Sequence, residues 1–386
     1  MRRPRIRNAG IDLLMALTLT ACASTTAPTS GPGSASVTTA AINRLPVVSD
    51  VFGPAKWSAT SAKGLSSAPL VLSDRVVVTQ GAEVAALDAS GKTAWKKSID
   101  LLPDSAHPNG QRTVIAATPK VLALIDQGTL PKGSDALAKD SRGIRVTLLS
   151  TDNGSKIAEQ TIPGDQVERT TGLAFTITTG NTVEYIAISP TGEKTTAKDG
   201  RLPLATVGDN TVWGTLYNGN MGTQFPAATG LPLENATVQA SDEHGVVVLS
   251  NPDATAWVDL ATGRTLTPDA SCTKPPAPQK LHASPDGAYV VGENAIANVT
   301  KGTITCVGGG DGQKAVKWDA ATDDGTAYGR TTDTAGTLVV ARGSDVKTYP
   351  IPADARDTIL VGFTSGGMAM LFDPSSGVVN GSSVKE

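Results

Sequence analysis

A strand–turn–strand pattern with a glycine in its turn returns along most of this chain. It is clearest in VAALDASGKTAW, residues 84–95, where an apolar run ends at Asp88, turns at Gly91 and resumes toward Trp95. The glycines of the eight copies are Gly91, Gly154, Gly192, Gly230, Gly263, Gly302, Gly343 and Gly377. Their average spacing is about 41 residues, close to the 40–45 residues that a unit of four short strands occupies.

The segments between these turns favour strands over helices. From Trp57 onward, short runs of Val, Ile, Thr and Leu alternate with Gly, Pro, Asn and Asp, and no sustained apolar spacing of three and four residues is present. We therefore predict an all-β protein, a β-propeller of about eight four-stranded blades, with seven blades as the alternative. A pair of β-sandwiches is the competing architecture, but it would not produce such regular spacing. One interval is long, and we assign its excess to a loop insertion at 126–143.

The N-terminus is typical of an exported protein. A short apolar run, residues 13–21, follows four basic residues and is too short to span a bilayer, which is typical of a secretory signal peptide. The basic residues are Arg2, Arg3, Arg5 and Arg7. Leu19-Thr20-Ala21-Cys22 resembles the bacterial lipobox, which implies cleavage before Cys22 and acylation of Cys22, palmitate included. Plain secretion with a chance cysteine is the alternative.

Residues 23–46 contain mainly Ser, Thr, Ala, Pro and Gly, a composition that cannot bury enough apolar surface to fold. We predict a signal peptide at 1–22, a disordered tether at 23–46 and a single propeller domain at 47–386. Two acyl chains anchor a protein durably, so we expect the cell membrane, at its extracytoplasmic face. Cleavage changes the formal charge from −3 to −6. Without a basic stripe the chain lacks what phosphate binding requires, so we expect no nucleic acid partner.

The cysteine content agrees with export. Apart from Cys22 the chain has only Cys272 and Cys306, in a compartment where disulfides persist. One connectivity is available to two cysteines, and we predict a Cys272–Cys306 disulfide. Two independent buried thiols are the alternative.

Residues that would carry chemistry are sparse. His107, His244 and His282 are isolated and lack zinc spacing. The carboxylates Asp319, Asp323 and Asp324 lack the spacing of a calcium loop and are typical of a solvated turn. No nucleophile elbow or phosphate-binding loop is present in the folded region. We therefore assign no catalytic, cofactor-binding or metal-binding residues and expect no cofactor.

The opening repeat resembles a known family. Ala86-Leu87-Asp88, Gly91-Lys92 and Trp95 fill the pattern of the quinoprotein-like (PQQ-like) propeller repeat, and residues 258–266 are a second copy. The resemblance implies that Trp95 packs between blades and does not stack on a quinone. It also implies no quinone site, because the adjacent cysteines of quinoprotein dehydrogenases have no counterpart here. Lipobox, tether and propeller together look like the outer-membrane-assembly propeller lipoproteins, and equally like propeller lipoproteins of actinobacteria.

These observations favour a binding module over an enzyme. We expect a monomeric, membrane-anchored scaffold for another cell-envelope protein, because propellers present broad loop-lined faces. The loops at 126–143 and 221–225 are the first candidates for contact. A hydrolase or lyase with its site in the central channel and a sugar-binding lipoprotein are the alternatives. Carboxylates from different blades could pair in such a channel, and a single sequence cannot pair them.

Overall fold

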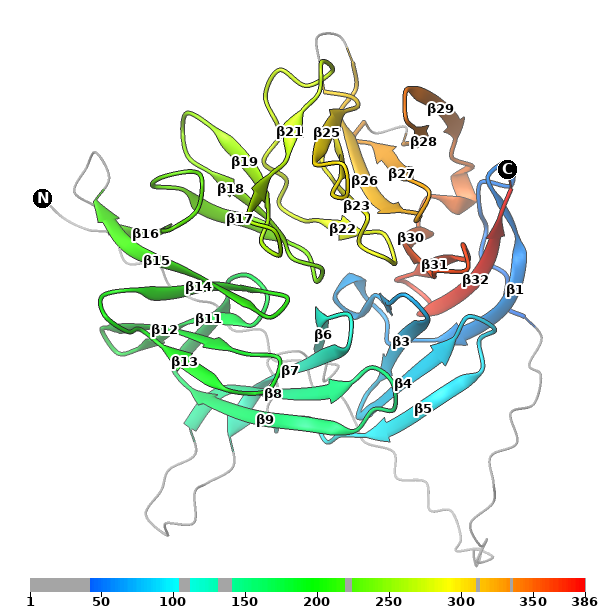
Figure 1. The fold of residues 1–386 in the computed structure, drawn as a ribbon. Coiled ribbons are helices and arrows are strands. Elements are labelled where there is room, and N and C mark those ends of the chain that lie inside the picture. The colour runs from blue at the N-terminus through cyan, green and yellow to red at the C-terminus, as the bar shows by residue number, and fades with distance from the viewer. Residues whose placement is uncertain are drawn as a thin grey trace, which may run out of the picture. The chain divides into compact units, whose positions relative to one another are not determined.

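Eight small sheets follow one another around a central axis in the computed structural model (Figure 1). The structure describes residues 42–103, 112–130, 141–218, 224–309, 313–333 and 336–385. Within these residues helical structure is limited to two single 3-10 turns, η1 (Leu65–Ser67) and η2 (Ala353–Ala355). The prediction of an all-β propeller with eight blades is confirmed, and seven blades are excluded.

Each blade is numbered here by its order in the ring, and its strands are given from the innermost outward. Blade 1 consists of β2 (Leu70–Val71), β3 (Arg75–Gln80), β4 (Glu83–Asp88) and β5 (Thr93–Ser98). Blade 2 consists of β6 (Thr113–Thr118), β7 (Val121–Leu130), β8 (Ser141–Ser150) and β9 (Lys156–Pro163). Blade 3 consists of β10 (Gln166–Arg169), β11 (Ala174–Thr179), β12 (Thr182–Ile188) and β13 (Lys194–Thr196). Blade 4 has three strands, β14 (Leu202–Val207), β15 (Asn210–Asn218) and β16 (Gln224–Ala228).

The second half of the chain continues this order. Blade 5 consists of β17 (Thr237–Ser241), β18 (Val246–Ser250), β19 (Thr255–Asp259) and β20 (Arg264–Thr265). Blade 6 consists of β22 (His282–Ala283), β23 (Tyr289–Gly292), β24 (Ala295–Asn298) and β25 (Thr303–Cys306), with β21 (Thr267–Pro268) added in parallel to β25. Blade 7 consists of β26 (Val316–Ala321), β27 (Thr326–Thr331), β28 (Thr337–Arg342) and β29 (Asp345–Pro350).

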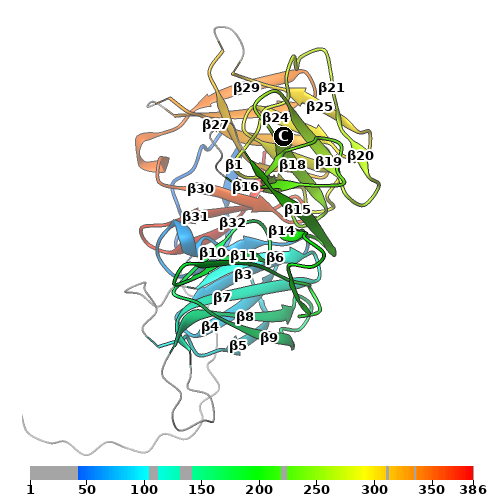
Figure 2. The ribbon, with the colours of Figure 1, turned by 90° about the vertical axis from the view of Figure 1, so that its left-hand side faces the viewer.

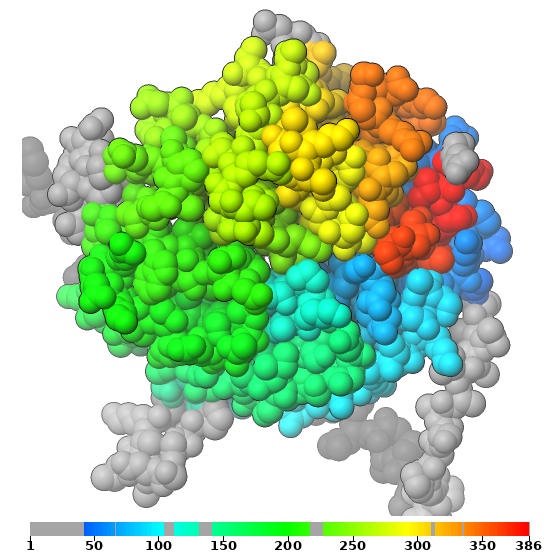
Figure 3. Space-filling model, viewed as in Figure 1, coloured from blue at the N-terminus to red at the C-terminus, as the bar shows by residue number. Residues whose placement is uncertain are grey.

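Blade 8 joins the two ends of the described chain. Its inner strands are β30 (Ile359–Phe363), β31 (Ala369–Asp373) and β32 (Val378–Val384), and its outer strand is β1 (Phe52–Thr60). The antiparallel β1–β32 ladder places Trp57 opposite Gly381. The first and last strands of the described chain consequently lie side by side (Figure 3).

The core lies in the seams between consecutive blades. Val146 and Leu148 of blade 2, for example, belong to the same buried cluster as Phe175 and Ile186 of blade 3. Alternating residues of each strand therefore face one neighbouring sheet or the other, which is why the strands are rich in β-branched and apolar residues. The outer strands β5 and β9 lie at the periphery of the molecule in both ribbon views (Figures 1 and 2).

All eight predicted turn glycines adopt a positive φ, from 60° at Gly343 to 90° at Gly192. Six of them lie between the third and the outer strand of a blade, as the pattern predicts, and Gly230 follows β16, the third and last strand of blade 4. Gly377 instead lies between β31 and β32, the second and third strands of blade 8. The outer strand of that blade comes from the N-terminus, so its third strand has no turn leading outward.

The segment 126–143 is only partly an insertion loop. Residues 126–130 extend β7 and residues 141–143 belong to β8, and the two strands pair from Val121↔Ser150 to Leu130↔Ser141. Ten-residue strands, longer than those of the other blades, therefore account for part of the long interval. Residues 131–140, like residues 221–223 of the other candidate loop, lie outside the described residues.

Candidate functional site

A cavity of about 660 Å³ lies at the centre of the ring and is lined by the innermost strand of every blade or the residues beside it. The innermost strands are β2, β6, β10, β14, β17, β22, β26 and β30. Inner strands line the channel because each sheet runs radially and presents its first strand to the axis. This volume lies within the range of small-molecule sites, so we take the cavity as the candidate functional site.

The wall of the cavity has an apolar and a charged part. Leu70, Ile115, Ile359 and Val361 line it from blades 1, 2 and 8. The charged and titratable residues come from blades 3 and 5 to 7 and from the segments around their inner strands. They are Arg169, Asp242, Glu243, His244, Lys280, His282, Lys317 and Asp319.

Three cations share this space. Lys280 precedes β22, Lys317 lies on the neighbouring β26, and Arg169 ends β10 of blade 3. Burial lowers the pKa of Lys280, and the positive charge of Lys317 lowers it further, with a smaller contribution from Arg169. Burial also lowers the pKa of Arg169. Both shifts mean that the surroundings stabilise these positive charges less well than water does.

His282 belongs to the same group. Burial lowers its pKa to about 3, and the charges of Lys280 and Lys317 contribute in the same direction. The imidazole is therefore neutral at physiological pH, and one of its nitrogens carries a hydrogen while the other can accept a hydrogen bond.

Asp242 is the most buried carboxyl group of the cavity wall, with 6% of its surface exposed. Its Oδ1 accepts hydrogen bonds from the backbone N–H groups of His244, Gly245 and Val246 at 3.0, 2.8 and 2.8 Å. Its buried Oδ2 has no partner in the described part of the chain. Burial, with a smaller contribution from the charge of Glu243, raises the pKa of Asp242 to about 7.

Asp319 is held by Arg330. Its Oδ2 lies 3.5 Å from Arg330 Nε, and Arg330 Nη2 also donates to the Thr358 carbonyl oxygen at 2.5 Å. Burial raises the pKa of Asp319, and the charge of Arg330 opposes that shift. The structure thus separates Asp319, which lines the cavity, from Asp323 and Asp324, which lie in the β26–β27 turn.

The two carboxylates of the β26–β27 turn accept hydrogen bonds from blades 6 and 7. Asp324 Oδ1 accepts from Thr322 Oγ1 at 2.6 Å, and Asp323 Oδ1 accepts from the Asp286 N–H of blade 6 at 2.9 Å. His244 of blade 5 packs where a side chain on Gly287 would otherwise lie. No group of three His, Cys, Asp or Glu residues suited to a metal ion occurs among the residues that the structure describes.

Trp95 lies away from the cavity, in the seam between blades 1 and 2. Its indole Nε1–H donates to the Thr151 carbonyl oxygen at 2.8 Å. Its ring covers Gly154, where a Cβ would come within 2.6 Å of the indole. The outer strand of one blade thus contacts the third-to-outer turn of the next, and this contact needs both the tryptophan and the glycine.

Trp57 repeats this arrangement at the point where the ring closes. Its Nε1–H donates to the Ala89 carbonyl oxygen at 2.9 Å, and its ring covers Gly91 of blade 1. Sequence reasoning missed Trp57, although a signal was present, because Trp57 follows Gly53 by four residues just as Trp95 follows Gly91. Gly91 is therefore required twice, for its positive φ of 81° and for the space that the indole occupies.

The other seams use different side chains at this place. Arg264 of β20 packs its guanidinium group over Gly302 and donates to the carbonyl oxygens of Val299 and Thr300. Gln160 of β9 donates to the Gly192 carbonyl oxygen at 2.8 Å. The repeat is degenerate in sequence because several donors can satisfy the same turn carbonyl groups.

Cys272 and Cys306 are joined by a disulfide, with their Cα atoms 4.9 Å apart. The bond ties the segment after β21 to the outer strand β25 of blade 6. Cys22, the predicted lipidation residue, lies outside the described residues, as does His107. Within the described residues, no helix has the length and apolar character needed to cross a membrane.

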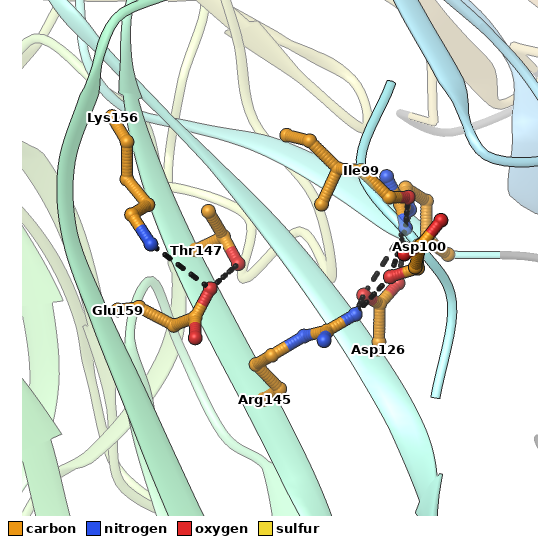
Figure 4. A network of polar contacts seen from close by, with 8 residues as sticks. Ile99, Asp100, Asp126, Arg145, Thr147, Lys156 and Glu159 are labelled. Atoms are coloured by element: carbon orange, nitrogen blue, oxygen red, sulfur yellow. Dashed lines mark hydrogen bonds and ion pairs between the residues drawn. The ribbon is translucent and has the colours of Figure 1, made fainter. Parts of the chain in front are cut away.

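A buried charge network in blade 2 was not foreseen from the sequence. Arg112, whose side chain is fully buried, pairs with Asp126 at 2.9 Å, and Arg145 pairs with the same carboxylate at 2.9 Å. Arg112 also donates to the Ile99 carbonyl oxygen at 2.8 Å, and Arg145 donates to the Asp100 carbonyl oxygen (Figure 4). The network has a structural role, because it holds the β5–β6 connection that joins blade 1 to blade 2.

Known proteins were compared with this chain by sequence and by structure. A search of curated protein sequences finds no match. Many solved structures match, among them the β-propeller domain of Cps50 (Swd1) from Myceliophteria thermophila, at 10% identity and a TM-score of 0.42 over 85% of this chain and all of that one. BamB from Moraxella catarrhalis matches at 12% identity and a TM-score of 0.30 over 84% of each chain. Dihydro-heme d1 dehydrogenase NirN in complex with DHE matches at 13% identity and a TM-score of 0.37, over 85% of this chain and 79% of that one.

A match between the sequence and a family model identifies the family. Residues 19–266, more than half of the chain, match the family model described as outer membrane protein assembly factor BamB. The match covers all strands of the first five blades. The chain therefore belongs to the family of the outer membrane protein assembly factor BamB.

Proposed function

We propose that this protein is a lipid-anchored propeller on the extracytoplasmic side of the cell membrane that binds another protein of the cell envelope. The observation that carries the proposal is the family match over residues 19–266, because the family is described as an assembly factor for other proteins. The eight-bladed ring supports it, since a rigid scaffold of this kind presents loops for recognition. A likeness of fold alone would not support a function, because one fold hosts many functions.

The anchor is the first part of the proposal. Residues 1–22 would be a lipoprotein signal peptide and 23–46 a tether, with the propeller at 47–386. Cys22→Ala should release the protein from the membrane or leave an uncleaved precursor, which fractionation and mass spectrometry of the N-terminal peptide would detect. The double variant Cys272→Ala/Cys306→Ala is the control, because it alters the other two cysteines and should stay membrane-bound. Normal processing and retention of Cys22→Ala would refute the anchor.

The contact with a partner is the second part. Leu65, on η1 beside the cavity, is the most exposed large apolar side chain of the described residues, at 70%. Single exposed apolar residues are common on protein surfaces, but this one lies at the mouth of the channel, where apolar anchors suit a protein interface. We assign the contact surface to this mouth.

A photo-crosslinking amino acid at position 65, in intact cells, tests the assignment. One at position 183 serves as the control, because Val183 is 52% exposed on β12, away from the channel. A discrete adduct with one envelope protein at position 65, which a Leu65→Asp variant fails to co-purify, is the expected result. Adducts of equal yield at both positions, or at neither, would exclude the mouth as the contact surface.

The enzyme alternative has one specific observation to consider. Asp242 and Asp319 both line the cavity and have raised pKa values. Three backbone N–H groups bind Asp242, and Arg330 holds Asp319. The family match favours binding over catalysis, because the family is described as an assembly factor.

A further inference from the structure

A short segment covers the outer edge of blade 6. Residues 267–272 run along β25, and β21 pairs with it in parallel at Thr267↔Thr303 and Pro268↔Ile304. Blade 6 is thereby a five-stranded sheet, whereas the other sheets of the described residues have three or four strands. A pairing of two residues is short for a strand, so other contacts must hold this segment in place.

Polar contacts join the segment to β25. Its backbone N–H groups donate two hydrogen bonds of 2.8 Å, from Thr267 to the Gly302 carbonyl oxygen and from Asp269 to the Ile304 carbonyl oxygen. The carboxylate of Asp269 also accepts from Thr305 Oγ1 at 2.5 Å. These contacts lie at the surface, since all of residues 267–271 are exposed apart from the half-buried Pro268. Hydrogen bonds that compete with water contribute little net stability.

Cys272 is the point at which this segment enters the protein interior. Its side chain is 6% exposed and belongs to the apolar cluster in the seam between blades 5 and 6. Its disulfide joins it to Cys306, the last residue of β25. The next two residues, Thr273 and Lys274, are exposed again. Cys272 is therefore the one buried residue between positions 267 and 275.

Trp257 of β19 fixes the chain at both ends of this stretch. Its carbonyl oxygen accepts from the Leu266 N–H at 2.8 Å, and its indole Nε1–H donates to the Pro276 carbonyl oxygen at 2.9 Å. Trp257 and Leu266 are also fully buried, at 0% and 1% exposed. Residues 267–275, which we call the strap, lie between these two fixed points. The strap can therefore open while Leu266 and Pro276 stay in place.

Little besides the disulfide keeps the strap closed. Ordering a chain segment costs backbone entropy at every residue. Against this cost the strap has hydrogen bonds at the surface and a single buried side chain, that of Cys272. Segments with few buried apolar contacts open locally while the rest of the fold persists. The disulfide prevents such opening, because it attaches the middle of the strap to β25.

We propose that residues 267–275 are a redox-controlled strap, which the Cys272–Cys306 disulfide holds closed over the outer edge of β25 and which a dithiol reductant releases. One thiolate of the dithiol attacks a sulfur of the disulfide, and its second thiolate then displaces that sulfur. The protein gains two thiols, and the dithiol becomes an internal disulfide. Cys306 is only half-buried, which leaves an approach for the attack.

Release of the strap uncovers the backbone N–H and C=O groups along β25. An uncovered strand edge is a place at which another chain can pair. The redox state of one bond would thus decide whether blade 6 ends in a protected or an open edge. The inference does not depend on the proposed lipid anchor or on the proposed binding of an envelope protein.

Hydrogen exchange of the full chain in phosphatidylcholine nanodiscs, before and after reduction with dithiothreitol, tests this inference. Mass spectrometry of the peptides measures the exchange, and alkylation verifies that Cys272 and Cys306 have been reduced. We expect the amides of 267–275 and of β25 to exchange roughly tenfold faster or more after reduction. The rest of the ring should exchange as before, and reoxidation should restore the original rates.

The double variant Cys272→Ala/Cys306→Ala should show the fast exchange of the reduced protein without any reductant, and dithiothreitol should no longer change it. Asp269→Ala is the matched control, because it removes the contact with Thr305 but keeps the disulfide. Its strap should stay closed until the bond is reduced. Thermal melting verifies that each variant is folded, and the reduced parent protein supplies the same comparison should the double variant unfold.

Three results would overturn the inference. Unchanged exchange at 267–275 after complete reduction would mean that the hydrogen bonds hold the strap by themselves. Faster exchange throughout blades 5 and 6 would mean that the bond only supports the fold. An Asp269→Ala variant that opens as far as the reduced protein would mean that the carboxylate, and not the disulfide, controls the strap. A protein that crosslinks at position 65 and shows no local opening would leave the proposed function intact and remove this inference alone.

Discussion

Asp242 shows how one residue can link the cavity to pH. Its carboxyl group ionises near 3.8 in an unfolded chain, whereas burial raises its pKa to about 7 in the folded protein. Between these values the folded state keeps a proton that the unfolded state has lost. This residue's contribution to stability therefore falls as the pH rises from about 4 to about 7, and the full penalty is present above that.

Asp242→Asn removes this penalty, because the amide oxygen can still accept from the three backbone N–H groups. We expect the variant to be more stable than the parent at pH 8 by roughly 2–4 kcal/mol and about equally stable at pH 3. Urea unfolding at both pH values measures the difference. Asp259→Asn is the control, since both oxygens of this buried residue have hydrogen-bond partners. A variant equally stable or less stable at pH 8 would show that the native carboxylate is ionised without cost.

At the scale of the elements, the blade seam depends on a fixed pairing of an outer strand with the next turn. Trp95 and Trp57 donate to turn carbonyl oxygens and pack on Gly154 and Gly91. Each glycine thus meets two requirements, a left-handed backbone and an open face for the indole. These two requirements can be tested separately. Gly263 also has a positive φ, 70°, but no atom lies within 4 Å of a Cβ built on it.

Gly154→Ala should destabilise the protein by roughly 2–4 kcal/mol, the cost of a left-handed alanine together with overpacking against Trp95. Gly263→Ala should cost only about 1–2 kcal/mol, because it carries the backbone term alone. Urea unfolding of the two variants gives the comparison. Equal losses would mean that the indole moves aside freely and that the seam is not tightly packed.

For the whole molecule, ring closure rests on β1. The pairing of β1 with β32 joins residues more than 300 positions apart and buries Phe52 and Trp57, which are 5% and 7% exposed. These two side chains alone account for roughly 3–6 kcal/mol of burial, comparable with the total stability of many proteins. Closure also protects β32, whose edge would otherwise be open to other chains.

Deleting residues 1–61 should therefore produce a chain that aggregates or melts far below the parent. Deleting residues 1–41 is the control, since it leaves the compact unit that begins at Ile42 intact. Gel filtration and thermal melting distinguish the two. A monomeric fragment 62–386 with an unchanged melting temperature would show that the ring is stable without the outer strand of blade 8.

The sequence by itself determined the repeat and thereby the architecture. Turn glycines must sit where the backbone is left-handed, and strands must alternate apolar residues toward two neighbours, so local pattern and fold agree. The pairing of Cys272 with Cys306, the only cysteines besides Cys22, could likewise be predicted from the sequence. Trp95 could be assigned to a seam through its family resemblance, because its position in the repeat fixes its place in the blade.

The tertiary structure decided what depends on residues that come together only in the ring. The outer strand of blade 8 is β1, so Gly377 lies between the second and third strands of its blade and not between the third and the outer one. Trp57 of β1 occupies the seam position in blade 8 that Trp95 occupies in blade 1. Arg169, Lys280 and Lys317 lie on innermost strands, or directly beside one, in three blades. The first two are 111 residues apart, and no motif joins any of them. A radial fold brings distant inner strands to one axis, and sequence spacing does not record that convergence.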